Sequence, residues 1–357
     1  MKNKKICFII AGLGVGGAEN VVIQLANSMS LDNDVTIVSI TDDLSLKFKL
    51  AQNISVVVHD VKSSISNLIA FYAYFRKNKF DIVHAHMYHA NLFSRLIKLI
   101  NKKLFLINSI HNTLEIRNKK KRALVNILYR ITDRYVDCMT NVSLNATQQT
   151  LADKITKSQK ISTIYNGVDF ATIEENKRVQ LRLKKKNYVI ITVASLTEQK
   201  GIDNAINAIS ELVHTGINVE YHIIGQGRLD DDLSALITSL NMQDHIFLHG
   251  VSNNVTGLIK DADLFLLPSR WEGFGLVILE AVACNINIAA TRCDGPLEIL
   301  GPDYKHLCQP DSVNALINVI KNCYHDNTIR YDGNAIKAKF QLSKMIENYN
   351  KLYSQVN

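Results

Sequence analysis

Short apolar runs rich in Val, Ile and Phe alternate along this chain with amphipathic segments of helical period. In the first half these runs lie at 5–11, 34–40, 54–59, 81–86, 104–110 and 136–142. Continuous runs of this kind are typical of parallel strands that helices cover on both faces. The alternation therefore predicts βα units around a parallel sheet.

The same alternation restarts after a polar, charged stretch at 174–187, which we interpret as a linker. The new apolar runs lie at 188–194, 219–225, 245–250, 263–268 and 287–291. A length of 357 residues suits two domains.

We therefore expect an α/β fold of two doubly wound, Rossmann-like domains in tandem, at 1–168 and 169–333. The remaining 334–357 should be helical and cross back to the first domain. Ligands of such sheets bind outside the carboxyl ends of the strands, which predicts a cleft between the two domains.

Composition limits the cellular setting. No apolar run reaches the roughly 18 residues of a membrane-spanning helix. The basic, apolar start imitates a signal peptide, but Gly12, Gly14, Gly16 and Gly17 interrupt it. The six cysteines form no CxxC pair, as expected of free thiols in a reducing compartment. We expect a cytoplasmic protein.

Charge is distributed unevenly along the chain. Residues 1–169 carry a net charge of +11 and residues 170–357 carry −3. A basic run, followed by the amphipathic stretch ALVNILYRI, predicts contact with an anionic membrane surface, with a solvated loop as the alternative. The run consists of Arg117, Lys119, Lys120, Lys121 and Arg122. It lacks the interleaved aromatic residues that stack on bases, so we expect no nucleic-acid partner.

Two features of the first half leave alternatives open. Gly12–Gly17 matches G-x-G-x-x-G after the first strand, which suits either a dinucleotide phosphate or a tight structural turn. His84, His86 and His89 end the fourth run, and their spacing favours the wall of a cleft over a metal site.

A stronger motif follows the run at 263–268. Glu272 and Glu280 are eight residues apart, about 12 Å if all were helical, and so cannot act on one bond. They can hold the two ends of an extended ligand. The amides between them, at the start of a helix, suit a diphosphate; they belong to Gly273, Phe274, Gly275 and Leu276. A nucleotide sugar has this layout.

The segment EGFGLVILEAVAC resembles the Glu-x7-Glu motif of retaining family 4 of the GT-B glycosyltransferases, the glycosyl transferases group 1. Other segments are similar to this family in the expected order. They are GGAENVVIQLA (16–26), DIVHAHMYHAN (81–91), INSIHNT (107–113), the hinge-like YNGVD (165–169), VASLTEQKG (193–201) and IIGQGRLDDDL (223–233). The resemblance covers nearly the whole chain and implies the GT-B fold.

The resemblance also implies roles for single residues. Glu272 would bind the donor sugar, Glu280 the ribose, and Lys200 the departing diphosphate. Gly16 and Gly17 would close over the phosphates, and His111 would touch the sugar near the reacting carbon.

One position departs from the family. Ser195 stands in the phosphate-binding segment where the family usually has an arginine. Arg270 or Arg228 could replace that guanidinium.

The family implies transfer from a nucleotide-diphosphate sugar, most often a UDP-sugar, to a lipid-linked saccharide in polysaccharide or O-antigen assembly. The enzyme would lie at the inner face of the cytoplasmic membrane. We expect no metal cofactor: Asp261 and Asp263 precede a strand, and 230–232 starts a helix, where acids favour the dipole. The alternatives are a sugar-nucleotide epimerase, an NAD-dependent oxidoreductase, or a basic module that binds membranes or nucleic acid.

Overall fold

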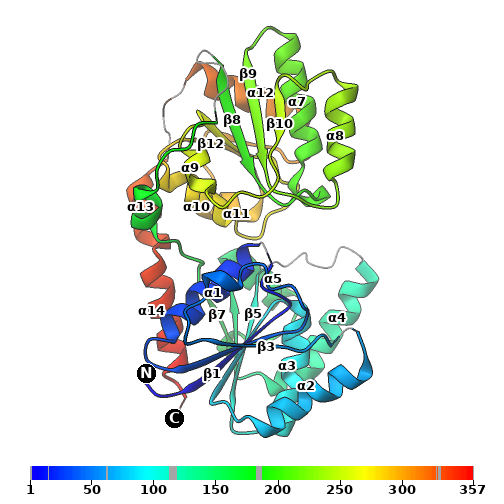
Figure 1. The fold of residues 1–357 in the computed structure, drawn as a ribbon, viewed down its shortest axis with the longest axis vertical. Helices are drawn as coiled ribbons and strands as arrows, with labels where there is room; N and C mark the ends of the chain where they lie inside the picture. The colour runs from blue at the N-terminus through cyan, green and yellow to red at the C-terminus, as the bar shows by residue number, and fades with distance from the viewer. Residues whose placement is uncertain are drawn as a thin grey trace. The chain divides into compact units, whose positions relative to one another are not determined.

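The computed structural model describes residues 2–14, 16–61, 63–111, 119–181, 187–326, 328 and 331–356, with only the backbone of 119–121. The chain divides into two compact units (Figure 1). The first comprises Met1–Gly167 and Ser343–Asn357, and the second comprises Val168–Leu342. Each unit is built around one parallel sheet, which confirms the predicted α/β fold.

The first unit has a seven-stranded sheet of order β3-β2-β1-β4-β5-β6-β7. Its strands are β1 (Lys5–Ile10), β2 (Asp34–Ser39), β3 (Ser55–Val58), β4 (Ile82–His86), β5 (Phe105–Ile110), β6 (Cys138–Asn141) and β7 (Ile161–Thr163). The direction of winding reverses between β1 and β4, so their carboxyl ends form the switch point where doubly wound sheets bind ligands.

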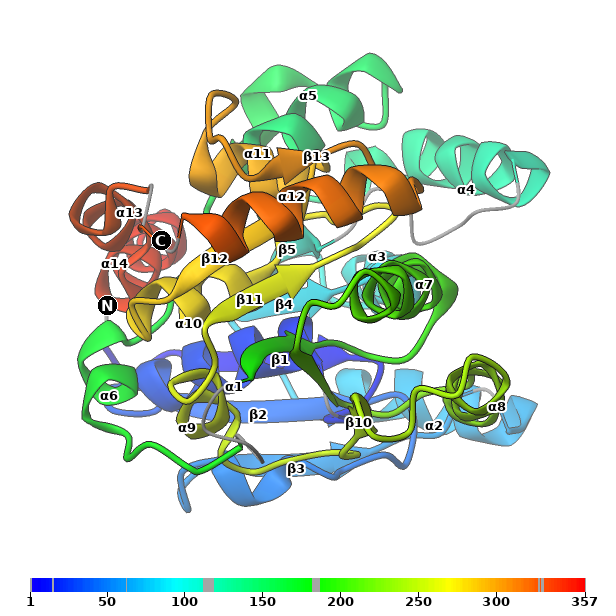
Figure 2. The same ribbon diagram turned by 90° about the horizontal axis from the view of Figure 1, so that it is seen from above.

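Helices cover both faces of this sheet. They are α1 (Gly17–Met29), η1 (Lys47–Lys49), α2 (Ile65–Lys77), α3 (Tyr88–Ile100), α4 (Lys119–Thr132), η2 (Asp133–Tyr135), α5 (Leu144–Ala152), η3 (Ser158–Lys160) and the terminal α14 (Leu342–Tyr353). Figure 2 shows α1 and α14 on one face and α2, α3 and α4 on the other. Phe71 of α2, Ile97 of α3 and Tyr129 of α4 pack on the second face against Ile9 and Val83.

The second unit repeats this plan with six strands in the order β10-β9-β8-β11-β12-β13. They are β8 (Tyr188–Val193), β9 (Val219–Ile224), β10 (Ile246–Leu248), β11 (Leu264–Leu267), β12 (Asn287–Thr291) and β13 (Leu307–Cys308). Here the switch point lies between β8 and β11.

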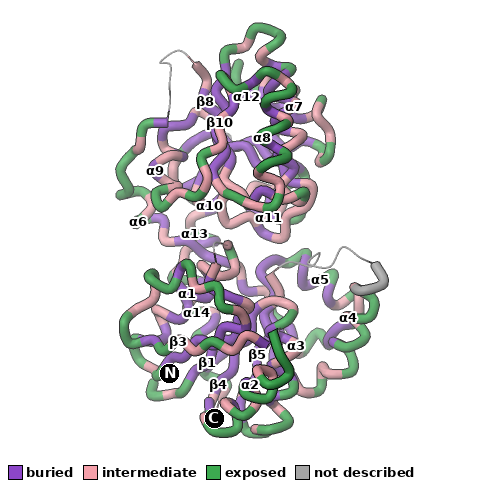
Figure 3. The backbone as a smooth tube through the Cα atoms, turned by 45° about the vertical axis from the view of Figure 1, so that its right-hand side comes forward, coloured by how far each residue is buried: buried purple, intermediate pink, exposed green. Residues whose placement is uncertain are grey.

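The helices of the second unit also form two layers. They are α6 (Phe170–Glu175), η4 (Glu198–Lys200), α7 (Ile202–His214), α8 (Asp230–Ser239), α9 (Val255–Ile259), α10 (Leu276–Ala283), α11 (Asp294–Leu300), α12 (Val313–His325) and α13 (Gly333–Phe340). One face of the sheet packs against α7, α8 and α12. Figure 3 shows the buried residues concentrated along the strands and on the inner sides of the helices.

Every predicted run contains a strand, but two strands were missed. They are β7 and β13, with three and two residues. Neither strand belongs to a continuous apolar run, whereas β10, which is also three residues long, consists only of apolar residues.

The predicted linker at 174–187 is wrong over the residues that the structure describes. Val179 donates its N–H to the carbonyl of Gly257 at 2.9 Å. Leu181 donates to the Asp261 carboxylate at 2.8 Å, and Arg178 pairs with the same carboxylate at 2.7 Å. Residues 174–181 therefore pack on the second unit. The many charged residues of this segment favoured a linker, although Val179 and Leu181 attach it to the second unit.

The C-terminal segment, predicted at 334–357 as helical and returning to the first domain, is helical in the structure, and its last part belongs to the first unit. It forms two helices, of which α13 lies in the second unit and α14 almost entirely in the first. The turn between them is fixed because Val168 bonds on both sides of Gln341, at 3.1 Å to Phe340 and 3.0 Å to Leu342.

Candidate active site

Lys200 and Glu272 meet at the switch point of the second unit. Lys200 ends η4, which follows β8, and Glu272 lies in the loop after β11. The Lys200 Nζ lies 2.5 Å from Glu272 Oε2, and the two side chains are 17% and 10% exposed. Ser269 donates its hydroxyl to the same oxygen at 3.3 Å. Both charged residues were predicted as site residues from the sequence, but the contact between them was not.

The two loops approach closely because of a glycine. Gly201 has φ +61°, and a Cβ on it would lie 2.3 Å from the carbonyl oxygen of Pro268. Arg270 donates its N–H to the carbonyl of Gln199 at 2.8 Å, and Gln199 donates its side-chain amide to Trp271 at 3.1 Å. Only glycine allows both this backbone conformation and this approach. In the sequence, the glycine directly after Lys200 is the feature that could have indicated this close approach of the two loops.

Arg270 does not replace the family's missing arginine, so that alternative is wrong. Its guanidinium makes a bidentate pair with Asp203 at 2.8 and 2.7 Å and bonds to Asp311 at 2.7 Å. Hydrogen bonds to these two carboxylates raise the pKa of Arg270. The two carboxylates neutralise its charge, and the pair with Asp203 holds the loop after β11 to α7.

Arg228 remains available for that role. Its side chain is 66% exposed, and Nη2 lies 3.6 Å from Glu198 Oε1. The loop that carries Arg228 lies against the loop of Ser195, because Gly227 approaches the backbone of Leu196. Ser195 itself is exposed. The two positions therefore share the same edge of the sheet.

The glycine-aromatic-glycine segment starts α10. Gly275 caps the helix with φ +85°, so the helix begins at Leu276 and Glu272 lies before it. The distance of about 12 Å for a continuous helix therefore does not apply. Phe274 is buried, with its ring 5.6 Å from that of Phe340, and this anchors the segment. Glu280 follows on α10 and is half-buried.

The glycine loop of the first unit lies at that unit's own switch point. Gly16 caps α1 and Gly17 is its first residue. A Cβ added to Gly16 would lie 2.3 Å from a carboxylate oxygen of Glu19. A Cβ added to Gly14 would lie equally close to a carboxylate oxygen of Asp43. Burial and the charge of Asp43 raise the pKa of Glu19. Carboxylates on both sides of the loop disfavour a pyrophosphate there, because like charges repel. This holds for a dinucleotide and equally for the donor diphosphate that the resemblance places at Gly16 and Gly17.

His111 lies above two buried histidines. His111 Nε2 is 2.9 Å from His86 Nδ1, and His84 lies next to His86 with ring centroids 4.0 Å apart. Burial lowers the pKa of all three, that of His111 to about 4. His84 and His86 are fully buried, so the prediction that they line a cleft is wrong; only His89 is exposed.

The basic run is described only in part. Arg117 lies outside the described residues, and Lys119, Lys120 and Lys121 start α4. Arg122 is half-buried. Beyond it, Leu124, Ile127, Leu128 and Ile131 are between 39% and 62% exposed. Their spacing places them on one face of α4.

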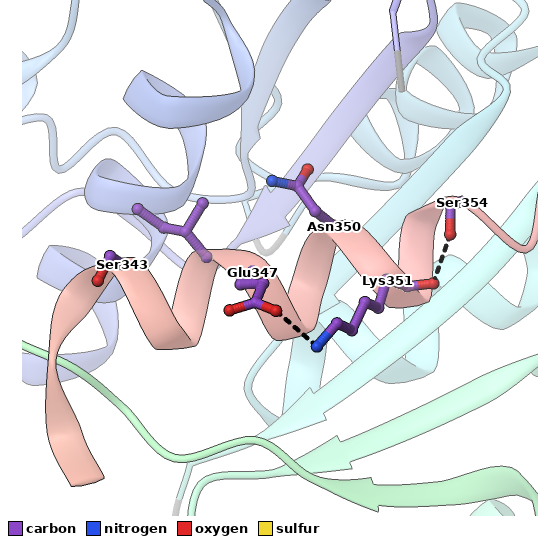
Figure 4. Close-up of a pocket in the computed structure, with 6 residues that line it drawn as sticks. Ser343, Glu347, Asn350, Lys351 and Ser354 are labelled. Carbon is purple, nitrogen blue, oxygen red and sulfur yellow. Dashed lines mark hydrogen bonds and ion pairs between the residues drawn. The ribbon is translucent and has the colours of Figure 1, made fainter. Parts of the chain in front are cut away.

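A surface groove on α14 is separate from these residues. It is lined by Ser343, Ile346, Glu347, Asn350, Lys351 and Ser354 (Figure 4). Glu347 and Lys351 form an ion pair at 2.6 Å along the helix. This groove contains no predicted site residue.

The described part of the chain lacks two further features. No group of three His, Cys, Asp or Glu residues there could hold a metal ion. No described helix is both long and apolar enough to cross a membrane.

Comparison with known families identifies the chain. The model of Glycosyltransferase Family 4 matches residues 15–172, and that of Glycosyl transferases group 1 matches residues 173–341. The chain belongs to the family 4 glycosyltransferases of GT-B fold. It is therefore an enzyme that transfers a sugar, which favours this function over the epimerase, oxidoreductase and binding-module alternatives.

Two curated relatives illustrate the range of this family. The chain is 24% identical to N-acetyl-alpha-D-glucosaminyl L-malate synthase of Bacillus anthracis, over 79% of this chain and 76% of that one. It is 25% identical to UDP-Gal:alpha-D-GlcNAc-diphosphoundecaprenol alpha-1,3-galactosyltransferase of Escherichia coli, over 85% and 81%. Among solved structures, Anabaena HepE in complex with UDP and glucose has a TM-score of 0.83 at 19% identity, covering 99% and 100% of the two chains.

Proposed function

We propose that this glycosyltransferase moves a sugar from a UDP-sugar, with retention of its anomeric configuration, to a lipid-linked saccharide. The observation that carries the proposal is the Lys200–Glu272 pair at the switch point, beside the start of α10. The cation suits the diphosphate, and the carboxylate suits the hydroxyls of the sugar. UDP is supported by its presence in the HepE complex and in the name of the E. coli relative.

The positive charge of Lys200 suits the negative charge that develops in the reaction. When the bond between sugar and phosphate breaks, negative charge builds on the departing diphosphate. Lys200 and the amides at the start of α10 would stabilise that charge. Glu272 is held by Lys200 and Ser269, which suits an orienting role rather than that of a nucleophile. The departing phosphate would then take the acceptor's proton on the same face of the sugar, which retains the configuration.

This arrangement gives the diphosphate cationic and dipolar partners from the chain itself, so we propose that no metal cofactor is needed. We expect UDP to stabilise the enzyme in the presence of EDTA. UDP at 100 times its dissociation constant adds about 2.7 kcal/mol to the free energy of unfolding. The measurement is the unfolding temperature against UDP, GDP, ADP, NAD and several UDP-sugars, with and without EDTA.

The matched variants for this experiment are Glu280→Ala and Glu211→Ala, the second on an exposed part of α7. Glu280→Ala should abolish the stabilisation by UDP, whereas Glu211→Ala should keep it. Stabilisation by NAD alone would contradict the proposed UDP-sugar donor. Stabilisation by UDP only in the absence of EDTA would contradict the proposed metal independence.

The acceptor and the membrane contact are supported by the surface of the first unit. The apolar face of α4 is exposed, and its neighbours add Leu96, Leu99 and Ile100 on α3 and Ile65 and Ile69 on α2. These helices share one face of the sheet (Figure 2). The first half of the chain is also basic. An apolar helix face beside positive charge suits the surface of an anionic membrane, where a lipid-linked saccharide is presented. We infer a peripheral location at the inner face and a step in surface polysaccharide or O-antigen assembly.

We expect the triple variant Leu124→Ser, Ile127→Ser and Ile131→Ser to weaken vesicle binding about a hundredfold. Each side chain inserted into lipid contributes roughly 1 kcal/mol from its buried apolar area. Cosedimentation with phosphatidylglycerol vesicles measures the effect.

A control pair is Leu31→Ser with Phe48→Ser, since both residues are as exposed but follow α1 and β2. Equal losses in both variants would contradict a docking role of α4. A triple variant that binds as wild type, or an enzyme that uses only a water-soluble acceptor, would contradict the membrane acceptor.

A further inference from the structure

His86 contacts the candidate active-site histidine but sits beneath it, out of reach of solvent. It ends β4, and His111 follows β5, the neighbouring strand. Because alternate residues of a strand point to the same face, His84 and His86 share one face of the sheet. Ser109 and His111 lie on that face of the next strand. The single polar contact of His86 among the described residues is its Nδ1, 2.9 Å from His111 Nε2.

We propose that His86 is a positioning residue, which donates its Nδ1–H to His111 Nε2 and so holds His111 in the tautomer that carries its proton on Nδ1. The catalytic consequence rests on the proposed function. The tautomer itself rests only on the contacts of the first unit.

The direction of this hydrogen bond follows from burial. One of the two facing nitrogens must donate, since both rings are neutral near pH 7. If His111 donated, His86 would carry its own proton on Nε2, which is buried and has no hydrogen-bond partner among the described residues. A buried N–H without an acceptor is rarer than a buried acceptor without a donor. The donor is therefore His86.

The surroundings keep the His86 ring in this orientation. The ring of His84 packs against it, tilted, with centroids 4.0 Å apart, and the ring of Phe8 lies at 5.9 Å. His84 is itself held at both nitrogens, by the Tyr353 hydroxyl and by Ser109 Oγ, each at 2.6 Å. Thr140 and Tyr349 extend this network. Two tyrosines of α14 thus fix the histidine that supports His86.

This arrangement restricts what His111 can do. With Nε2 accepting from His86, the other ring nitrogen, Nδ1, carries a proton. Such a nitrogen donates a hydrogen bond to a hydroxyl or ring oxygen of a sugar but does not accept a proton from it. His111 is therefore a neutral donor and not a general base. Burial lowers the pKa of His111 to about 4, so a second proton on the ring is disfavoured near pH 7.

The deciding experiment is nuclear magnetic resonance of the whole enzyme labelled with 15N in its histidines. Two-bond proton–nitrogen correlations at pH 7 distinguish the two neutral tautomers, and the His111→Asn variant identifies the His111 signals. The expected result is a protonated Nδ1 and an unprotonated Nε2 in His111. A protonated Nε2, or two protonated nitrogens, would overturn the proposal. This measurement is independent of any donor or acceptor, so it stands even if the proposed function fails.

Kinetics of sugar transfer test the consequence. His86→Ala removes the donor, whereas His86→Asn places an amide N–H near the position of Nδ1. We expect His86→Ala to lower kcat at least about tenfold, as wrong tautomers do elsewhere, and His86→Asn to restore much of it. In the alanine variant, access of water lets the pKa of His111 return toward about 6.5, so activity should fall below that pH. The wild type should keep its activity there.

The matched control is Tyr349→Phe, which removes a hydroxyl from the far end of the same buried network and keeps the ring of His84 beside His86. It should lower the unfolding temperature without a new ionisation in the pH profile. If Tyr349→Phe and His86→Ala share one pH profile, His86 has only a structural role.

Discussion

Lys200→Ala should lower kcat/KM for sugar transfer by about 10²–10³, the loss typical of removing one group that stabilises negative charge in a transition state. The reason is the position of Nζ, which lies 2.5 Å from Glu272 Oε2 at the switch point of the second unit. We propose that the same cation faces the departing diphosphate when the donor is bound. Its loss should affect kcat more than the binding of UDP, because the charge grows only as the bond breaks.

Steady-state kinetics and the unfolding temperature together separate the two effects of this variant. Lys200→Ala also leaves the largely buried Glu272 carboxylate without its cation, which destabilises the fold. The double variant Lys200→Ala with Glu272→Ala should regain stability but not activity. Lys305→Ala, at an exposed lysine of the same unit, is the control and should match wild type. A Lys200→Ala enzyme within about threefold of wild type would contradict the role of Lys200 in transition-state stabilisation.

The apolar runs predicted the two sheets, because strands leave local patterns. The residues of this pair came from the Glu272 motif and, for Lys200, from the resemblance to family 4. The sequence did not predict that Lys200 and Glu272 touch. They are 72 residues apart, and their contact depends on how closely the two loops pack. That packing is set by Gly201, whose missing side chain admits the carbonyl of Pro268.

Arg270 shows why charged residues near a motif are hard to interpret. A guanidinium beside the Glu272 segment looks the same in sequence whether it binds a phosphate or a carboxylate. Its partners are the carboxylates of Asp203 and Asp311, which lie 67 and 41 residues away in the sequence. Likewise, His84 ends a strand in a position that suits a cleft wall. Its burial is decided by Tyr353, 269 residues later, on a helix that the sequence placed only coarsely.

Gly295→Ala should reduce kcat/KM about a hundredfold while leaving the binding of UDP nearly intact. A Cβ at this position would lie 2.1 Å from the carbonyl oxygen of Phe274 and 2.7 Å from its Cα. Both are backbone atoms, so no side-chain rotation relieves the clash. The loop and the start of α11 must move apart by on the order of 1 Å, a displacement that can cost about 10² in rate.

The selectivity of this effect comes from what Gly295 holds. Its N–H bonds to the carbonyl of Glu272 at 3.0 Å, so the displacement moves the residue that we propose binds the donor sugar. Glu280, which we propose binds the ribose, lies further along α10. Overpacking should also lower the free energy of unfolding by roughly 1–3 kcal/mol.

Transfer kinetics, UDP titration and urea unfolding measure the three quantities. Gly333→Ala is the control, because the added carbon at the start of α13 meets nothing nearer than 3.6 Å. It should leave activity unchanged and favour the helix by up to about 1 kcal/mol. If Gly295→Ala lost UDP binding and transfer equally, Glu272 and Glu280 would respond as one rigid site, and the separate roles proposed for the sugar and the ribose would be wrong.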